Sequence, residues 1–477
     1  MTILFAASEM APLARTGSRA DSVAALSAAL RARGHEVSVV LPCYRGLRDR
    51  PGTRPTGVTI PVQAGPKLQK AEILEIVEPN GVQVFLIRLD EYFDRPTLFG
   101  EEGQPFEDNA ERFIFFSRAV VELVRRILPP PEIIHVHDWE TALVPVLMRE
   151  RRLPFRTVLT VNDFARQGSF WAFDFGLTGL PCDYFTERGV EYYGNINLLK
   201  GGLLYAEQIA TVSGSYARAI QSPEGGCGLD PVLRLQAHKL TGILPGLDDS
   251  TWNPQTDATL PAHFGPGDLA GKRACRDALL TKLDLAPNPL GPVFAMVAPL
   301  ASRTGYDLLL PLVDRLLADD VRLIILGSSE TGFARELLIA DRRHQGRFAF
   351  LNTWDAGLEH LVFAGADIAL SAIPPEPGGE SVLRALHYGA VPLACAAAGV
   401  DEVVTDLDPA TGTGNGFLAF IATPEALWDT IKRAKRSFAE PSEWNPIVER
   451  GMRSDVSWGQ AATRYEAVYR SALGRKA

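Results

Sequence analysis

The first 45 residues form one predicted strand–loop–helix–strand unit, and this unit constrains the fold more than any other stretch. Residues 2–7 are a short apolar run of strand length, residues 20–33 are rich in Ala and Leu with helical periodicity, and residues 36–41 are a second apolar run. Gly34 suits the position just past a helix end. The pattern predicts a βαβ unit of a parallel sheet, with residues 8–18 as a loop at its carboxyl edge.

This loop is a candidate anion site because the first backbone N–H groups of a helix have no partner within the helix. Arg15 and Arg19 lie beside the predicted helix start. Two interpretations stay open at this point. The loop binds a phosphate or a sugar, or the unit is a plain crossover with two solvated arginines.

The chain has 477 residues, which predicts two domains with sizeable cores. Its formal net charge of −9 argues against a nucleic-acid partner, since phosphate contact needs a basic face. The 5 cysteines are scattered and match neither a disulfide framework nor a zinc site. We therefore expect reduced thiols and a cytoplasmic protein. We also expect no signal peptide, because the first apolar run is short and lacks a basic lead. No membrane partner is expected, because no apolar run is long enough to span a bilayer.

A second series of strand and helix patterns starts near residue 292. The predicted strands are residues 293–298, 321–326, 348–351, 368–370 and 391–394, and residues 308–317 are one of the helices between them. In the first half, residues 57–62, 71–77 and 82–89 predict added hairpin structure, residues 109–126 a helix, and residues 133–136 and 157–161 further strands. The fold class is therefore α/β with two Rossmann-like domains.

The first loop reads S-E-M-A-P-L-A-R-T-G-S-R-A-D-S-V and resembles the N-terminal donor loop of bacterial glycogen synthases and plant starch synthases. That family reads S-E-x-x-P-x-x-K-T-G-G-L-A-D-V. Arg15 stands where the family has Lys, and Ser18 where it has the second Gly. The matching residues are Glu9, Thr16, Gly17 and Asp21.

Further motifs extend the resemblance over nearly the whole chain. The segment H-V-H-D-W-E-T-A-L-V-P resembles the family's H-A-H-D-W-H-T-A-L-V-P, with Glu140 in place of the second His. The segment N-D-F-A-R-Q-G has Asn162 where the family has a His. The longest match covers residues 184–254, including G-V-E-Y-Y-G-N-I-N-L-L-K-G-G.

The second half departs from the family where a diphosphate is expected. The segment A-P-L-A-S-R-T-G matches the family's S-R-L-x-x-Q-K-G, so Pro299 takes the place of its Arg and Thr304 that of its Lys, while Arg303 lies one residue early. The segment P-E-P-G-G-E-S-V matches F-E-P-C-G-L-T-Q and keeps Glu376. Glu380 adds an anion beside the expected diphosphate.

The resemblance implies the GT-B architecture, two Rossmann-like domains facing across a cleft. It implies an acceptor-side domain at residues 1–245, a nucleotide-sugar domain at residues 246–450 and, at residues 451–477, a helix that returns to the first domain. The implied reaction is retaining transfer of glucose from ADP-glucose to the non-reducing end of an α-1,4-glucan.

The resemblance also implies roles for individual residues. The implied catalytic residues are Glu376, Asp138 and Asn162. The implied donor-binding residues are Arg15, Thr16, Gly17, Ser18, Asp21, Arg303, Gly378, Gly379 and Ser381. The implied acceptor-binding residues are Glu9, Trp139, Asn197 and Lys200. No metal and no cofactor are expected, and the expected partners are an α-1,4-glucan and an active synthase or other glycogen enzymes.

Three hypotheses on activity stay open. Loss of one transition-state charge contact lowers a rate by about a hundred- to a thousand-fold, and the residues at 162, 299 and 304 remove several at once. These losses slightly favour a catalytically weak or inactive glucan-binding or regulatory paralogue. The alternatives are an active ADP-glucose-dependent glycogen synthase, in which Arg15, Arg303 or Lys200 compensates, and a transferase with a different nucleotide-sugar donor.

Overall fold

The structure is a computed structural model, and it describes residues 1–101, 104–126, 129–287, 290–300, 304–327, 332–353, 355–372, 379–396 and 399–474. The chain divides into two compact units. The first comprises Met1–Leu244 together with Trp458–Ala477, and the second comprises Pro245–Ser457. None of the helices in the described part of the chain is long and apolar enough to cross a bilayer.

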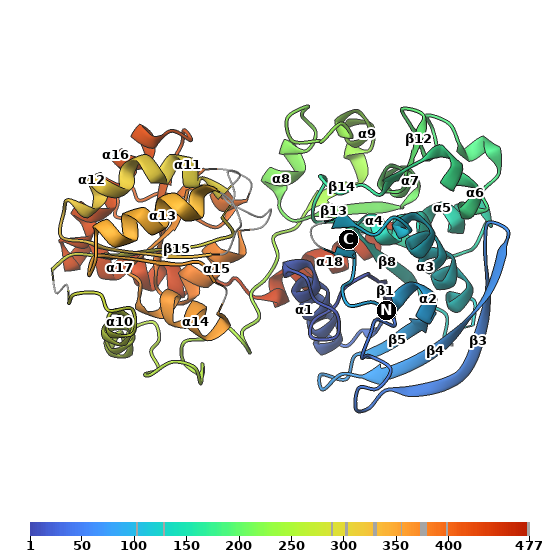
Figure 1. The fold of residues 1–477 in the computed structure, drawn as a ribbon, viewed down its shortest axis with the longest axis horizontal. Helices are drawn as coiled ribbons and strands as arrows, with labels where there is room; N and C mark the ends of the chain where they lie inside the picture. The colour runs from blue at the N-terminus through green and yellow to red at the C-terminus, as the bar shows by residue number, and fades with distance from the viewer. Residues whose placement is uncertain are drawn as a thin grey trace. The chain divides into compact units, whose positions relative to one another are not determined.

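The first unit is built on a sheet of nine strands in the order β14-β13-β9-β8-β1-β2-β5-β4-β3. Their bounds are β1 Thr2–Ala6, β2 Glu36–Pro42, β3 Arg54–Ala64, β4 Lys67–Val77, β5 Gln83–Arg88, β8 Ile133–His137, β9 Arg156–Val161, β13 Gln208–Thr211 and β14 Leu240–Gly242. Strands β14 to β5 are parallel, and β4 and β3 continue the sheet as an antiparallel hairpin (Figure 1). The strands and the added hairpin predicted from the sequence are confirmed.

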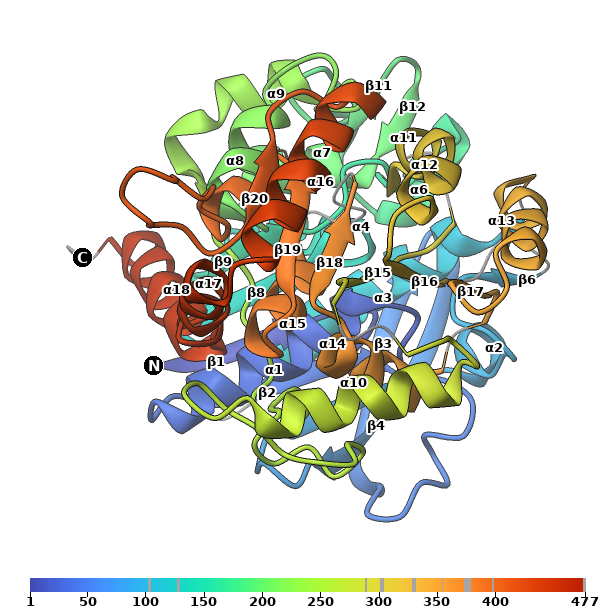
Figure 2. The ribbon, with the colours of Figure 1, turned by 90° about the vertical axis from the view of Figure 1, so that its left-hand side faces the viewer.

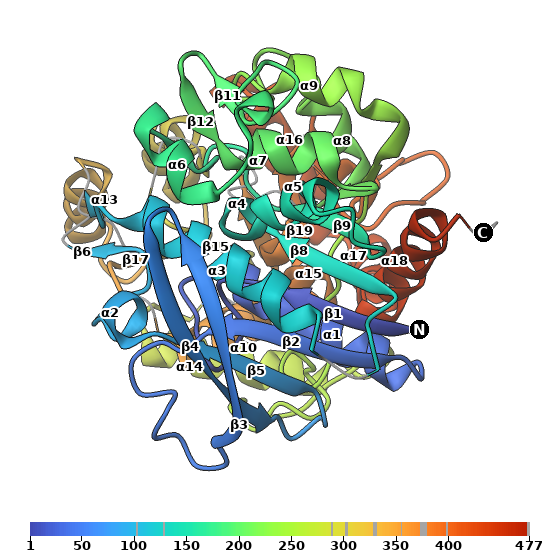
Figure 3. The same ribbon diagram turned by 90° about the vertical axis from the view of Figure 1, so that its right-hand side faces the viewer.

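Helices cover this sheet. Their bounds are α1 Ser18–Ala32, α2 Asp90–Phe93, α3 Asn109–Val124, α4 Asp138–Thr141, α5 Leu143–Glu150, α6 Phe175–Thr178, α7 Leu198–Tyr205, α8 Gly214–Ala219, α9 Asp230–Leu235 and α18 Trp458–Ala472, with 3₁₀ turns at Ala172–Asp174, Cys182–Tyr184 and Ala237–Lys239. Short strands form two small sheets, β6 Gly100–Glu101 with β7 Gln104–Pro105, and β10 Ser169–Phe170, β12 Asn195–Asn197 and β11 Glu191–Tyr192. Helix α3 packs on β3, and α18 packs on α1, β9 and β13 (Figure 3).

The second unit has a wholly parallel sheet in the order β17-β16-β15-β18-β19-β20 (Figure 2). Its strands are β15 Val293–Val297, β16 Arg322–Leu326, β17 Phe348–Leu351, β18 Ile368–Ser371, β19 Val391–Cys395 and β20 Phe417–Ala419. Its helices are α10 Ala270–Lys282, α11 Tyr306–Leu309, α12 Val313–Leu317, α13 Gly332–Arg343, α14 Ala356–Gly365, α15 Glu380–His387, α16 Pro424–Phe438 and α17 Pro441–Met452, with 3₁₀ turns at Leu310–Leu312 and Val400–Glu402.

The sequence prediction for the second unit is wrong in two details. The helix predicted at residues 308–317 is interrupted by the turn Leu310–Leu312, because Pro311 has no N–H to donate to the helix. Strand β20 was not predicted, since it has only three residues and so carries almost no periodicity.

Two buried histidines lie in the centre of the first sheet, on β8. The ring of His135 bonds the Oγ1 of Thr160 at 2.7 Å and the hydroxyl of Tyr469, on α18, at 2.9 Å. The Nε2 of His137 has no hydrogen-bond partner among the described residues, and both rings pack on Phe5. Burial lowers the pKa of His137 to about 3 and that of His135 well below its ordinary value.

We therefore expect the chain to lose stability on mild acidification. Because the folded pKa of His137 is lower than the unfolded value of about 6.5, the unfolded state takes up the proton first, and stability falls as the pH drops below that value. His137 alone should cost about 2 kcal/mol between pH 6.5 and 5. Urea unfolding at the two pH values should show a smaller loss for His137→Gln than for the wild type.

The exposed His238 provides the matched control, and His238→Gln should behave as the wild type. An equal loss of stability in the wild type and in His137→Gln would contradict the expectation.

Candidate functional site

The loops after β1, β8 and β9 hold most of the site residues predicted in the first unit. Because these strands are adjacent and parallel, their carboxyl ends meet at one edge of the sheet. Glu9 follows β1, Asp138 follows β8 and Asn162 follows β9. The chain runs from β1 to β2 and later returns to β8 on the other side of β1, so the loops after β1 and β8 flank the point where the strand order reverses. Open α/β sheets bind ligands at this point.

Glu9 fixes the loop after β1. Its Oε2 accepts hydrogen bonds from the backbone N and the Oγ1 of Thr16, both at 2.6 Å. Gly17 is the N-cap residue of α1, and a Cβ at this position would meet no atom within 4 Å. Ser18 begins the helix. The carboxylate of Glu9 therefore holds the loop in place, and the space beside Gly17 is open.

Arg15 and Asp21 form a two-point ion pair. The Nε and Nη2 of Arg15 donate to the two carboxylate oxygens of Asp21 at 2.8 and 2.9 Å. The side chain of Arg15 is 54% exposed, so it keeps access to solvent beside the start of α1. Its role in binding a donor stays a prediction.

Arg19 does not have the solvated position that the plain-crossover interpretation gave it. Its guanidinium lies 2.7 Å from a carboxylate oxygen of Glu9, 3.5 Å from one of Glu140 and 3.8 Å from one of Asp138. Burial opposes the charge of Arg19, but the carboxylates of Glu140, Asp138 and Glu9 outweigh it and raise its pKa. We call these four residues the Arg19 cluster.

Asp138 connects this cluster to the loop after β9. Its two oxygens accept hydrogen bonds from the backbone N and the Nδ2 of Asn162, at 2.8 and 2.9 Å. The backbone of Asp138 has a φ of 55°, a left-handed conformation that is uncommon for a residue with a side chain. Asn162, which stands where the family has a His, is thus held in one orientation by a neighbouring carboxylate.

Glu140 is the most deeply buried acid of the cluster. Its side chain is 1% exposed, and its Oε2 has no hydrogen-bond partner among the described residues. Burial raises the pKa of Glu140 to about 7, against the opposing attraction of Arg19.

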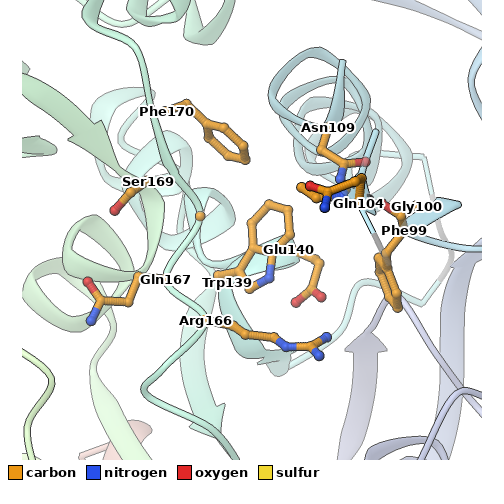
Figure 4. A pocket seen from close by; sticks show the side chains of 12 residues that line it. Phe99, Gly100, Gln104, Asn109, Trp139, Glu140, Arg166, Gln167, Ser169 and Phe170 are labelled. Atoms are coloured by element: carbon orange, nitrogen blue, oxygen red, sulfur yellow. Dashed lines mark hydrogen bonds between the residues drawn. The ribbon is translucent and has the colours of Figure 1, made fainter. Parts of the chain in front are cut away.

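An aromatic pocket with a volume of about 460 Å³ lies beside the cluster (Figure 4). Its lining residues are Phe99, Gly100, Gln104, Pro105, Asn109, Trp139, Glu140, Arg166, Gln167, Gly168, Ser169 and Phe170. The ring of Trp139 meets that of Phe170 edge to face at 5.5 Å. Gly168 has a φ of +61°, and a Cβ there would lie 2.4 Å from the indole of Trp139, so only glycine allows the backbone so close to the ring.

Asn197 and Lys200 lie behind the wall of this pocket. The Nδ2 of Asn197 donates to the side chains of Gln167 and Ser169 at 2.7 and 3.1 Å, and its Oδ1 accepts from the backbone N of Lys200. The Nζ of Lys200 donates to the carbonyl oxygens of Glu187, Gly189 and Glu191 at 2.7, 3.0 and 2.6 Å. Burial lowers the pKa of this ammonium group. Asn197 thus holds the segment 167–169, and Lys200 holds the loop 187–191.

Sequence reasoning missed Phe99, Arg166 and Phe170, which contribute to the pocket, and Arg112, which supports its wall. Arg112 is fully buried and donates to the carbonyl oxygens of Tyr92 and Leu98 and to the side chain of Asn109. The aromatic segment E-Y-F-D-R-P-T-L-F-G was the available signal for this wall. A charged residue inside an apolar helix pattern was the signal for Arg112.

In the second unit, Thr304 is fully buried and its Oγ1 donates to the carbonyl oxygen of Pro299 at 2.9 Å. Glu380 bonds Arg384 at 3.0 Å, and Arg384 also bonds Glu359 at 2.6 Å. Glu380 therefore shares the guanidinium of Arg384, one helical turn away, with Glu359.

Gly379, with a φ of +62°, is the N-cap residue of α15, and Ser381 lies in the first turn of that helix. The predicted site residues Arg303, Glu376 and Gly378 lie outside the described residues. Over the ranges that the structure describes, no three His, Cys, Asp or Glu side chains converge as metal ligands would.

Two family models match the chain. Residues 2–235 match the model described as starch synthase catalytic domain, and residues 284–445 match the one described as glycosyl transferases group 1. A glycogen synthase of Opitutus terrae is 36% identical and covers 99% of this chain and 100% of its own length. A glycogen synthase of Myxococcus xanthus is 39% identical over 98% of this chain and 99% of the relative.

Solved structures show the same likeness. The catalytic domain of starch synthase IV from Arabidopsis thaliana, bound to ADP and acarbose, matches with a TM-score of 0.89 at 30% identity over 99% of both chains. A sucrose-phosphate synthase from Thermosynechococcus elongatus matches with a TM-score of 0.63 at 16% identity and shows the fold alone. The predicted fold class, α/β with the GT-B architecture of two Rossmann-like domains, is confirmed.

The contacts of Lys200 lead to a test of its role. Lys200→Met should lower the free energy of unfolding by about 3 kcal/mol, because three carbonyl oxygens lose a charged donor. Urea unfolding measures this loss, and isothermal titration with maltoheptaose at low temperature should show unchanged affinity in the folded protein. The exposed Lys70→Met serves as the control. Full stability together with lost affinity would instead make Lys200 a direct ligand of the sugar.

Proposed function

Since the chain belongs to the glycogen and starch synthase family, we propose that it transfers glucose from ADP-glucose to the non-reducing end of an α-1,4-glucan. The observation that carries this proposal is the likeness to glycogen synthases over almost the full length of both chains. A starch synthase that is similar over the same length was solved with ADP and acarbose bound. We also place the reaction in the cytoplasm.

The aromatic pocket supports the acceptor half of the proposal. A glucan is uncharged and presents flat C–H faces, which pack well on aromatic rings such as Trp139 and Phe170. The pocket is also lined by the hydroxyl of Ser169 and the exposed guanidinium of Arg166, and such groups suit sugar hydroxyls. A negative chain does not repel a neutral polysaccharide.

The donor half follows from the family resemblance. Without a metal or cofactor, which we do not expect, a departing diphosphate needs fixed cations and helix starts nearby. In the first unit this proposal assigns donor contacts to residues 15–18 and Asp21. In the second unit it assigns them to Arg303, Gly378, Gly379 and Ser381, with Glu376 facing the anomeric carbon.

The competing hypothesis of a weak or inactive paralogue has less support. Its premises were the losses at positions 162, 299 and 304, and at the first of these Asn162 is held in a defined orientation by Asp138. Two relatives that match over almost the full length of both chains are glycogen synthases. We therefore favour an active transferase.

The test is incorporation of labelled glucose from ADP-glucose into maltoheptaose and glycogen by the purified chain. Trp139→Phe should lower kcat/KM about tenfold and Trp139→Ala about a hundredfold, because the stacking surface is first reduced and then lost. The control Phe173→Ala removes an aromatic ring that is 88% exposed, and it should change kcat/KM by less than about twofold. EDTA should have no effect.

Absence of any labelled product, at every ADP-glucose concentration and with both acceptors, would refute the proposal in favour of the inactive paralogue. Transfer from another nucleotide sugar alone would instead identify a different donor.

A further inference from the structure

Two departures from the family motifs meet in the structure. The motif after β1 has Leu where this chain has Arg19, and the motif after β8 has His where this chain has Glu140. These positions are 121 residues apart in the sequence, yet their side chains lie 3.5 Å apart. Arg19 is 17% exposed and Glu140 is 1% exposed. The chain has thus placed a new cation and a new anion against each other in a nearly closed space.

The charges around this pair do not balance. Arg19 faces three carboxylates, those of Glu9, Asp138 and Glu140, and two of these side chains, Glu9 and Glu140, are 2% exposed or less. Removing the guanidinium alone would leave three acids close together without a cation. Removing Glu140 alone would leave Arg19 with two partners. Removal of Arg19 therefore leaves more unpaired buried charge than removal of Glu140, and we expect it to be the more damaging substitution.

Arg19 also links three loops of the candidate site. Through Glu9 it is connected to Thr16 in the loop after β1. Through Asp138 it is connected to Asn162 in the loop after β9. Glu140 is next to Trp139, and both line the aromatic pocket (Figure 4). One guanidinium therefore sets how these three loops stand relative to one another.

We propose that Arg19 and Glu140 act as a coupled pair of positioning residues, which aligns the loops after β1, β8 and β9 for glucosyl transfer. Arg19 in place of the family's Leu is tolerated only together with Glu140 in place of its His, and Glu140 only together with Arg19. This inference rests on the proposed function, because alignment matters for a reaction at this edge. Neither residue is assigned a contact with the reacting atoms.

A double-mutant cycle tests the pair. The variants are Arg19→Leu, Glu140→His and the double variant, which restores the family residues at both positions. Arg19→Leu should lower kcat about a hundredfold and Glu140→His about tenfold, with KM changed less than about threefold. The double variant should recover to within about tenfold of the wild type, because an imidazole replaces the cation beside Glu9 and Asp138.

The control is a more exposed Arg–Glu ion pair on two strands that β2 and β5 separate from β1. Arg54 and Glu75 bond at 2.8 Å on the β3–β4 hairpin. Arg54→Leu, Glu75→His and their combination should each leave kcat within about twofold of the wild type.

Three results would overturn the proposal. The first is a double variant whose loss is the product of the two single losses, about a thousandfold. The second is wild-type kcat in Arg19→Leu. The third is a lower unfolding temperature in Arg19→Leu with unchanged kcat per folded molecule, which would make the pair merely structural. If Arg19→Leu does not fold, Arg19→Lys replaces it, and wild-type kcat in that variant would also overturn the proposal, since one ammonium cannot replace the guanidinium fork.

Failure of the proposed function is distinguishable from failure of the pair. If the wild type transfers no glucose, the same four proteins are titrated with maltoheptaose. Weaker binding in Arg19→Leu that the double variant restores would support the coupling without catalysis. Independent effects of the two substitutions on this binding would refute it.

Discussion

The first unit depends on one guanidinium that three carboxylates share. The parallel order of β9, β8 and β1 brings the carboxyl ends of these strands together. Glu9 follows β1, Asp138 and Glu140 follow β8, and Asn162 follows β9. Glu9, Asp138 and Glu140 would repel one another at this edge without Arg19. Because a buried charge must be paired, the position of Arg19 and the positions of the three loops are fixed together.

The aromatic pocket has a different kind of support. Its rings are held by packing and by backbone shape rather than by charge, as the close approach of Gly168 to Trp139 shows. Buried cations also hold nearby loops by their backbone carbonyls, since Lys200 bonds three of them and Arg112 bonds two. The charged residues among those that line the pocket are Glu140 and Arg166.

Motif comparison alone does not show which neighbours pair with a substituted residue. Glu380 looked like an added anion beside a phosphate, but the next turn of α15 carries its partner, Arg384. Arg19 looked like a solvated cation or an anion ligand, but three acids surround it. In each case the missing information was the partner, because the effect of a buried charge depends on whether a neighbour pairs with it.

The sequence by itself determined the α/β class, most strands of both sheets and the family, because periodicity and local motifs extend over short stretches of the chain. The resemblance to the family motifs also gave Glu9, Asp138, Trp139 and Asn162 as candidate site residues, and each of them comes soon after a predicted strand. Only the tertiary structure decided that Arg19 meets Glu140, that Asn162 bonds Asp138, and that Phe99 and Phe170 share a pocket with Trp139. Arg19 and Glu140 are 121 residues apart in the sequence, and Asp138 and Asn162 are 24 residues apart. Such distant contacts follow from the order of strands in the sheet, which no local pattern encodes.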